Sequence, residues 1–263
     1  MKYNFYLLFI NLFVFLFIGS SLIFAQDSSD TEKKKTGVIE YQLRAGINIG
    51  GFTPIPIPAE IRELSSFNPM LNISLEGNIT YLFKQTPSSW GIRTGVKLEN
   101  KGMKANSTVK NYRMEIIGGE GERVAGNWTG GVSTHIANSY ITIPTLAIFK
   151  INDRWSFSGG AFWSFLMDKN FSGYVFDGYL REGDPTGVKV IFEDGKTASY
   201  DFSNDLRQFS YGLQFGTTWQ FSKHINVFGD LSFGLNNMFK SDFKTITFTM
   251  RPVYLNLGAG YSF

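Results

Sequence analysis

The sequence contains no cysteine. This absence excludes a disulfide framework, a lipid anchor attached through a cysteine, thiolate metal sites and thiol nucleophiles. Histidine is nearly as scarce, with only His135 and His224. Because imidazole is the commonest metal ligand and a frequent general base, few groups are available for catalysis or metal binding. We therefore expect no cofactor and no enzymatic activity.

A strong charge of either sign is also missing. The chain has 25 Lys and Arg against 22 Asp and Glu, and Lys2 is the only charged residue among the first 25. Such a weak surplus argues against nucleic acid as a partner. After residue 25 there is no apolar run long enough for a membrane-spanning helix, so a helical membrane protein is excluded for that part of the chain.

The first 25 residues have the pattern of a secretory signal peptide. Lys2 precedes an apolar run over residues 5–18, and Gly19, Ser20 and Ser21 follow before Ala25. This order predicts export and cleavage after Ala25. An uncleaved membrane helix is the alternative, since the apolar stretch could continue to Phe24. Residues 26–37 are polar and charged, which predicts a flexible periplasmic lead.

Aromatic residues and glycine are abundant, with 26 Phe, 12 Tyr, 5 Trp and 28 Gly. Apolar and polar residues alternate with period two in eight segments, which predicts strands at 39–50, 68–83, 90–99, 139–151, 155–165, 207–221, 225–236 and 254–263. The turns after the second, fourth and sixth segments are short, whereas the other connections are longer. Residues 38–263 therefore predict an all-β fold, an eight-stranded antiparallel up-and-down β-barrel of the outer-membrane, transmembrane type.

The sequence also predicts loops and a hairpin between the strands, and it leaves the facing of one strand undecided. The proline-rich run 53–58 predicts a loop, and residues 103–136 and 168–205 predict two long loops. Within the second loop, residues 188–200 predict a hairpin that turns at Asp194 and Gly195. In segment 139–151 both faces are apolar, so its facing is ambiguous, and Pro144 predicts a bulge or bend there.

The last strand carries a pattern of its own. Asn256, Gly258, Tyr261 and Phe263 form a polar-x-Gly-x-x-aromatic-x-aromatic sequence that ends the printed chain. This pattern resembles the closing-strand signal of bacterial outer-membrane barrels. The resemblance implies recognition by the barrel-assembly machinery and residence in the outer membrane of a Gram-negative bacterium. An ordinary terminal strand of a soluble β-protein is the alternative.

The two faces of the predicted strands differ in kind. Charged residues of both signs fall on the inward face, where we expect a paired network: Glu40, Arg44, Glu76, Arg93, Lys97, Glu99 and Asp230. Aromatic residues fall at the strand ends that belong to the short turns, as in a membrane-interface belt: Tyr41, Tyr81, Trp90, Trp155 and Trp219. A soluble, lipocalin-like periplasmic binding barrel is the alternative, and it would point its apolar face inward.

Short motifs in the middle of the chain suggest a family. Residues 140–144 (Tyr-Ile-Thr-Ile-Pro), 160–166, Lys101-Gly102 and the Gly46-x-Asn48-x-Gly50 pattern resemble the PorT-like outer-membrane β-barrel proteins. Thr142 departs from that family, whose members often carry a carboxylate there. The resemblance implies outer-membrane residence, and one branch of the family takes part in protein secretion and gliding.

The sequence leaves two functional hypotheses. The first is a structural or interaction role, in which the barrel contacts membrane lipid and the long extracellular loops meet a secretion-system or extracellular protein. The second is a lipid-modifying enzyme that uses His135 with Ser133 near the outer rim. The motif Ser133-Thr-His135 supplies no third residue, so the first hypothesis is favoured.

Overall fold

The computed structural model of the protein describes residues 37–84, 86–117 and 122–263. The signal peptide predicted at 1–25 and the lead predicted at 26–37 lie outside the described residues, apart from Gly37. Within the described part, no helix is both long enough and apolar enough to cross a membrane.

Eleven strands and one short 3-10 turn make up the described chain. Their bounds are β1 Val38–Pro54, β2 Ile61–Asn68, β3 Asn72–Leu82, β4 Ser89–Ile117, β5 Arg123–Lys150, β6 Trp155–Asp168, β7 Phe171–Glu182, β8 Lys189–Asp201, η2 Ser203–Asp205, β9 Phe209–Gln220, β10 Ile225–Gly234 and β11 Met250–Ser262. Every strand pairing is antiparallel. The all-β antiparallel prediction is therefore confirmed, although eleven strands replace the eight that were expected.

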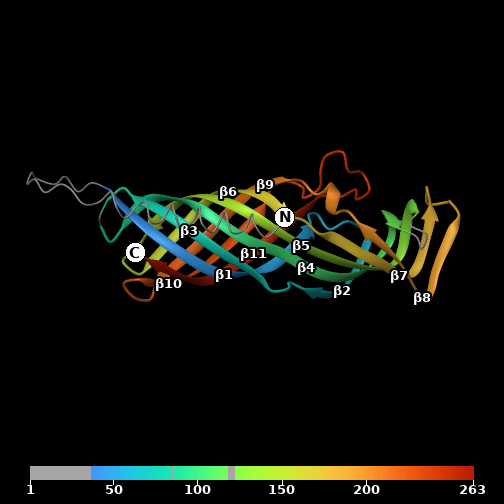
Figure 1. Cartoon of the computed structure of the whole chain (residues 1–263), viewed down its shortest axis with the longest axis horizontal. Coiled ribbons are helices and arrows are strands. Elements are labelled where there is room, and N and C mark those ends of the chain that lie inside the picture. Colours follow the sequence, from blue (N-terminus) through green and yellow to red (C-terminus); the bar gives the residue numbers. More distant parts are fainter. Residues whose placement is uncertain (1–36, 85, 118–121) are drawn as a thin grey trace, which may run out of the picture. The chain divides into compact units, whose positions relative to one another are not determined.

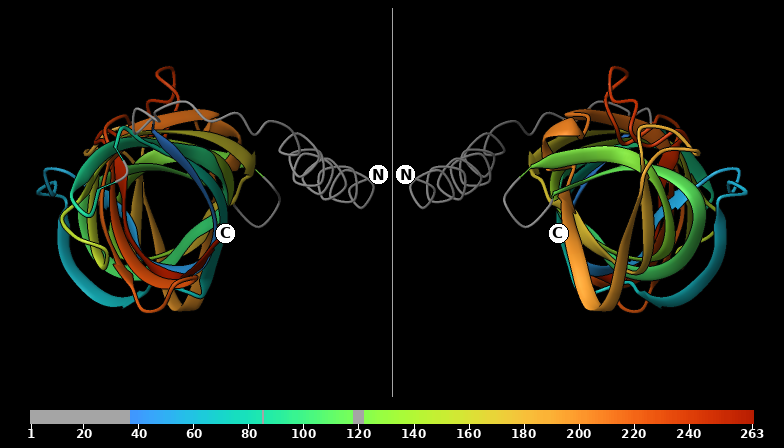
Figure 2. Two further views of the ribbon diagram at one scale, coloured as in Figure 1. Left: turned by 90° about the vertical axis from the view of Figure 1, so that its left-hand side faces the viewer. Right: turned by 90° about the vertical axis from the view of Figure 1, so that its right-hand side faces the viewer.

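Eight of these strands pair in a closed ring, in the order β1-β3-β4-β5-β6-β9-β10-β11 and back to β1 (Figure 2). The paired residues can be followed once around the ring: Glu40, Thr80, Arg93, Leu146, Gly160, Gln214, Ser232, Tyr254 and Gly50. The path returns to β1 ten residues further along, which means that the strands are strongly tilted. A ring of eight tilted strands has an interior just wide enough for its own side chains.

The two ends of the ring differ, as Figure 1 shows. One end holds the first residues of β1, the last residues of β11 and the short connections 83–88, 151–154 and 221–224. We call it the turn end. The opposite end, which we call the extension end, carries β2, β7, β8 and the long arms of β4 and β5 beyond the ring.

The ring has its polar side chains inside and its apolar side chains outside. Along β3, Asn72, Ser74 and Glu76 are buried, whereas the intervening Ile73 and Leu75 are 61% and 50% exposed. Large exposed apolar patches are rare on soluble monomers, and here they cover the wall. This arrangement is the reverse of what the lipocalin-like alternative requires.

The prediction of a loop at 103–136 is wrong. β4 and β5 continue there as paired strands, with partners from Met103 and Ile136 out to Ile117 and Arg123. Their inner face buries Met114, Trp128 and other apolar side chains. Because this face has a core to cover, the backbone stays in strand conformation instead of forming an open loop.

The prediction of a loop at 168–205 is also wrong, since β7 and β8 occupy most of this range. Their connection lies at 183–188 and not at Asp194 and Gly195, which lie within β8. Asp184 fixes the turn by accepting hydrogen bonds from the backbone N–H and the hydroxyl of Thr186, and Gly183 has a φ of 71°. Gly195, with a φ of 77°, lies instead in a stretch where the β7–β8 register shifts.

The expectations for two proline sites need smaller corrections. Pro144 stays in register with Phe162, so no bulge forms there, although the β4–β5 pairing is interrupted beside it. Thr94 compensates, because its hydroxyl donates to the carbonyl oxygen of Pro144 at 2.9 Å. Of the loop predicted at 53–58, Thr53 and Pro54 belong to β1.

An apolar core fills the interior toward the extension end. It is built from the inner faces of the extended strands and from the segment between β10 and β11, with Trp128, Ile136 and Val175 fully buried. Phe239 packs on Phe171, with ring centroids 5.0 Å apart. The ring is therefore filled by polar groups in one half and by an apolar core in the other.

Candidate functional site

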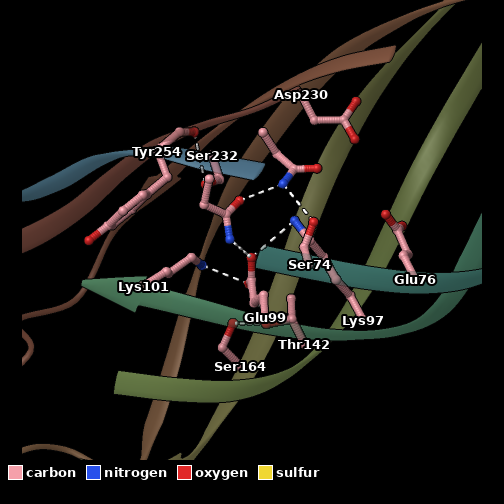
Figure 3. A network of polar contacts seen from close by, with 12 residues as sticks. Ser74, Glu76, Lys97, Glu99, Lys101, Thr142, Ser164, Asp230, Ser232 and Tyr254 are labelled. Carbon is pink, nitrogen blue, oxygen red and sulfur yellow. Dashed lines mark hydrogen bonds and ion pairs between the residues drawn. The ribbon is translucent and has the colours of Figure 1, made fainter. Parts of the chain in front are cut away.

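The polar half of the interior centres on Glu99 of β4 (Figure 3). Its carboxylate lies 3.0 Å from the ammonium of Lys97 and 2.8 Å from that of Lys101. Thr142 donates its hydroxyl to the same carboxylate at 2.7 Å, and the side-chain amide of Asn48 donates at 3.1 Å. A carboxylate taken out of water is tolerated when its oxygens are paired in this way.

A second cluster lies nearer the turn end and centres on Arg44 of β1. Its guanidinium bonds Asp230 at 2.9 Å, lies 3.6 Å from Glu76 and donates to Thr218 at 3.3 Å. The guanidinium also lies over the ring of Phe228, 3.6 Å from the ring centroid. Arg and aromatic faces attract each other, and the attraction is stronger in a desolvated site.

The seven charged residues singled out in the sequence are not all equivalent. Six are buried in the interior, as the alternation of their strands requires: Arg44, Glu76, Arg93, Lys97, Glu99 and Asp230. Arg93 donates to Thr80 at 3.0 Å. Glu40 lies instead at the turn end, partly exposed, and forms an ion pair with Lys150 at 2.9 Å.

Sequence reasoning missed Lys101 as a member of the network. Its ammonium is buried beside Glu99 and lies 5.2 to 5.9 Å from the ring centroids of Phe162, Tyr140 and Tyr254. The signal was available, since Lys101 continues the inward period of Lys97 and Glu99 on the same strand. It was overlooked because the strand was expected to end at residue 99.

Neutral polar side chains connect the charged groups. Asn256 of β11 donates through its amide to Asn48 at 2.6 Å and to Ser74 at 2.7 Å. Thr142 and Ser164 share a hydrogen bond of 2.7 Å. The network therefore runs across β1, β3, β4, β5, β6 and β11, and it ties the last strand of the ring to the first.

The closing-strand residues have distinct surroundings. Asn256 faces the interior network, and Gly258 lies so close to β1 that a Cβ atom there would overlap the carbonyl oxygen of Ala45. Tyr261 stacks on His224, with ring centroids 5.4 Å apart, and contacts Phe263 at 5.2 Å. Phe263 donates its backbone N–H to the carbonyl oxygen of Tyr41.

The five aromatic residues assigned to a belt all lie on the outer wall near the turn end. Tyr81, Trp90 and Trp155 are exposed, whereas Tyr41 and Trp219 are half-buried. Neighbouring rings contact one another, as for Trp90 with Phe149 at 4.6 Å and Trp155 with Trp219 at 6.3 Å. A second group, which includes Trp163, Phe165, Phe209 and Tyr211, lies on the wall toward the extension end.

Ser133 and His135 lie next to a cavity of about 660 Å³ beyond the ring, together with Ser172 and Tyr174. The ring nitrogen Nε2 of His135 is shielded from solvent and has no hydrogen-bond partner among the described residues. Partial burial, and then the charge of Lys104, hold the pKa of His135 below its ordinary value of 6.5. No hydrogen bond between His135 and Ser133 is present in the described chain, so the geometry does not assemble a nucleophile with its base.

The side chain of the other histidine contacts the backbone of the last strand. His224 lies in the 221–224 turn, and its Nδ1 lies 2.9 Å from the carbonyl oxygen of Ser262. Across the described ranges, no group of three or more His, Asp or Glu side chains could hold a metal ion.

One known protein family matches most of the chain. The outer membrane protein beta-barrel domain family matches residues 24–240. Ail, the attachment invasion locus protein of Yersinia pestis crystallised with the heparin analogue sucrose octasulfate, is 11% identical, with a TM-score of 0.37 over 87% of this chain and 99% of that chain. OprG of Pseudomonas aeruginosa is 13% identical, with a TM-score of 0.34 over 89% of this chain and 99% of that chain. No curated protein matches the sequence.

The family match covers most of the chain and includes strands β1 to β10. It agrees with the inside-out ring, whose wall is apolar and whose interior holds a buried polar network. The protein therefore belongs to the outer membrane protein beta-barrel domain family, and its ring of strands is an outer-membrane β-barrel.

Proposed function

We propose that this protein is a non-conducting outer-membrane barrel that presents its extension end to another protein outside the cell. The observation that carries the proposal is the free edge of β8. Among the described residues, β8 pairs along one edge with β7, whereas its other edge meets β4 only at the pair Ile117 and Ser199. An exposed strand edge offers backbone groups to which a partner strand can add.

The side chains around this edge support the same role. Val188 is 71% exposed and Ile191 is 49% exposed, while the opposite face of the hairpin is held against the core by Leu180 and Tyr200. The hairpin is therefore anchored on one side and apolar on the other. A rigid, partly apolar edge loses little conformational entropy when a partner binds.

The orientation follows from the lengths of the connections. Outer-membrane barrels carry short turns on the periplasmic side and longer segments outside. The turn end then faces the periplasm together with the cleaved N-terminus, and the extension end faces outward. The wall contacts membrane lipid, and the closing strand with Asn256, Gly258, Tyr261 and Phe263 is presented to the barrel-assembly machinery.

A protein of a secretion system is the partner class that we propose. The PorT-like resemblance of residues 140–144 supports this class, because one branch of that family takes part in protein secretion. Thr142, where relatives often carry a carboxylate, here donates to Glu99. Glu99 thus supplies a carboxylate from the neighbouring strand, and a second one at residue 142 would lie against it.

Orientation can be tested with single cysteines, since the chain has none of its own. A Thr186→Cys variant is expected to react with a membrane-impermeant maleimide on intact cells. Its control, Ser88→Cys in the 83–88 turn, is expected to react only after the outer membrane is opened. The reverse pattern would overturn the orientation and the proposed function with it.

The binding edge can be tested by cross-linking in cells. A photoreactive phenylalanine at Ile191 is expected to give a discrete adduct with one protein, and the Val188→Lys change is expected to remove that adduct. Met167 is 48% exposed and lies on β6, which pairs with β5 and β9 and not with β8, so the same probe there is the control. Equal adducts from both positions, or none from Ile191, would refute a binding edge on β8.

A further inference from the structure

The wall of the barrel has a gap beyond the first residue of β3, Asn72. The pairing of β1 with β3 stops at Asn48 and Asn72. Beyond it, residues 50–54 of β1 pair with β11 only, and β2 pairs with β4 only. The described β1 and β2 therefore face each other without a shared ladder, and Figure 2 shows the cyan segment that carries β2 standing off the ring.

At this gap, a backbone N–H on the edge of β1 has an unusual hydrogen-bond acceptor. The backbone N–H of Phe52 donates to the thioether sulfur of Met103, at 3.3 Å. A thioether is a weak acceptor, so this contact stands where a neighbouring strand would supply a carbonyl oxygen. Gly51 beside it leaves room for the side chains, because a Cβ there would lie 2.7 Å from the sulfur and 3.0 Å from the ring of Phe67.

A cavity of about 420 Å³ lies behind the gap. Its volume is within the range of small-molecule sites in proteins. None of the described residues that line it carries a charge, and most are apolar, among them Phe52, Ile61, Leu64, Phe67, Met103 and Val109. Only Thr53, Ser107, Tyr112 and Thr134 add hydroxyl groups among the described lining residues, so the cavity suits a hydrocarbon better than a charged ligand.

The mouth of the cavity adjoins the lipid-facing wall. Ile49, Leu71 and Ile73, which lie just below it on β1 and before or within β3, are all exposed, and Leu71 is 81% exposed. Gly51, Thr53 and Val253 on the outer face of the wall line the cavity together with Phe52 and Met250 on the inner face. The opening therefore passes around the edge of β1, from the apolar wall into the core.

A cationic side chain lies next to the mouth. Arg251 is opposite Thr53 in the β1–β11 ladder. Its Nε is shielded from solvent and has no hydrogen-bond partner among the described residues. A buried donor without an acceptor is costly, and an anionic head group would supply the acceptor.

We propose that the gap between β1 and β2 is a lateral binding site for one hydrocarbon chain of an anionic amphiphile from the outer leaflet, with its head group at Arg251. The chain enters from the bilayer and occupies the cavity behind Phe67 and Met103. The proposal goes beyond the proposed function, since neither the gap nor the cavity involves the β8 edge.

The test uses the full-length mature protein in lipid nanodiscs with a palmitic acid that carries a diazirine at the end of its chain. Light is expected to attach the probe to peptides that contain residues 61–67 and 103–109. In a Ser107→Phe variant, which fills the cavity, labelling of these peptides is expected to fall to the level of the β10 wall peptide. Val227→Phe, which places the same new side chain on the outer wall, is the control and is expected to label as the unaltered protein does.

Two further variants and a folding control accompany this labelling experiment. Folding is checked by the shift in gel mobility on heating, and Leu64→Trp fills the cavity from the exposed strand β2 if Ser107→Phe does not fold. Arg251→Gln is expected to reduce labelling by the acid but not by the corresponding long-chain alcohol.

Three outcomes would overturn the proposal. One is labelling of the peptides with residues 61–67 and 103–109 that is the same in Ser107→Phe and in the unaltered protein. Another is labelling of these peptides no stronger than that of the β10 wall peptide. The third is labelling by a compact neutral probe such as adamantane diazirine without labelling by the acid, which would assign the cavity to globular hydrophobic molecules.

Discussion

Removal of one carboxylate should destabilise this barrel more than any surface charge change. Glu99 is the common partner of two buried ammonium groups, Lys97 at 3.0 Å and Lys101 at 2.8 Å. The Glu99→Gln change keeps the shape of the side chain but removes the carboxylate that pairs directly with both cations. Taking away one partner of a buried ion pair costs about 3–5 kcal/mol, and we expect a loss of that size in the free energy of unfolding.

A matched control is present in the same strand. Glu115 pairs with Arg123 at 2.9 Å, but the Arg123 side chain is 63% exposed. Exposed pairs contribute up to about 1 kcal/mol, so Glu115→Gln should have little effect. Unfolding by urea in lipid vesicles, followed by tryptophan fluorescence, measures both variants.

A double variant tests the cause. If the cost in Glu99→Gln comes from unpaired cations, adding Lys101→Met should recover part of it, because one unpaired charge is replaced by an apolar side chain among Phe162, Tyr140 and Tyr254. The reasoning is wrong if Glu99→Gln and Glu115→Gln lose the same small amount, or if Lys101→Met makes the first variant worse.

Three other predictions concern different parts of the molecule. Trp128 is fully buried in the extension end, so Trp128→Ala should lower the free energy of unfolding by about 3–5 kcal/mol. Hydrogen exchange should then rise in β7 and β8 while the ring stays protected. Because the interior is filled, planar-bilayer recordings should show no large, steady conductance, and such a conductance would contradict the filled interior. Hydrogen bonds from Thr186 lower the pKa of Asp184 from its ordinary 3.8, so the protection of the Thr186 amide should persist above that pH and fall in more acidic solution. Asp184→Asn should remove this pH dependence.

The ring could be predicted from the sequence because two constraints act on every residue of its strands. The outer side must suit lipid and the inner side must fill a narrow space, so a period of two is imposed along each strand. The strand at 139–151 escaped this rule because both of its faces are apolar. Its facing depends on partners from elsewhere in the chain: Thr142 turns inward to Glu99, and Tyr140 turns inward near Lys101.

The extension end could not be predicted because its periodicity is broken. On β4, Met103 and Val109 face the core, but the register shifts between Val109 and Tyr112, and Met114 and Ile116 then face the core instead. A bulge that adds one residue moves the inward face from odd to even positions, so a single alternating pattern fails. The segment therefore looked like a polar loop.

Competing turn signals explain the misplaced hairpin. Asp194-Gly195 is a strong dipeptide signal for a turn. The sequence 183–187 (Gly-Asp-Pro-Thr-Gly) is another, because it contains two glycines, a proline and Asp184, whose carboxylate accepts hydrogen bonds within the turn. With the turn at 183–188, Val175 and Ala198 face the same buried core. Burial of both strands decides between two local signals that are similar in strength.

The position of the cavity also follows from the fold. The cavity lies where the wall of the ring is incomplete. Beyond Asn72 the place of β3 is taken by β2, which follows β4 and leaves the edge of β1 uncovered. A packing defect could have formed anywhere in the apolar core, but this cavity lies behind the edge where Phe52 donates its N–H to a sulfur. The uncovered edge and the space behind it have one structural origin, and that origin opens them toward the bilayer.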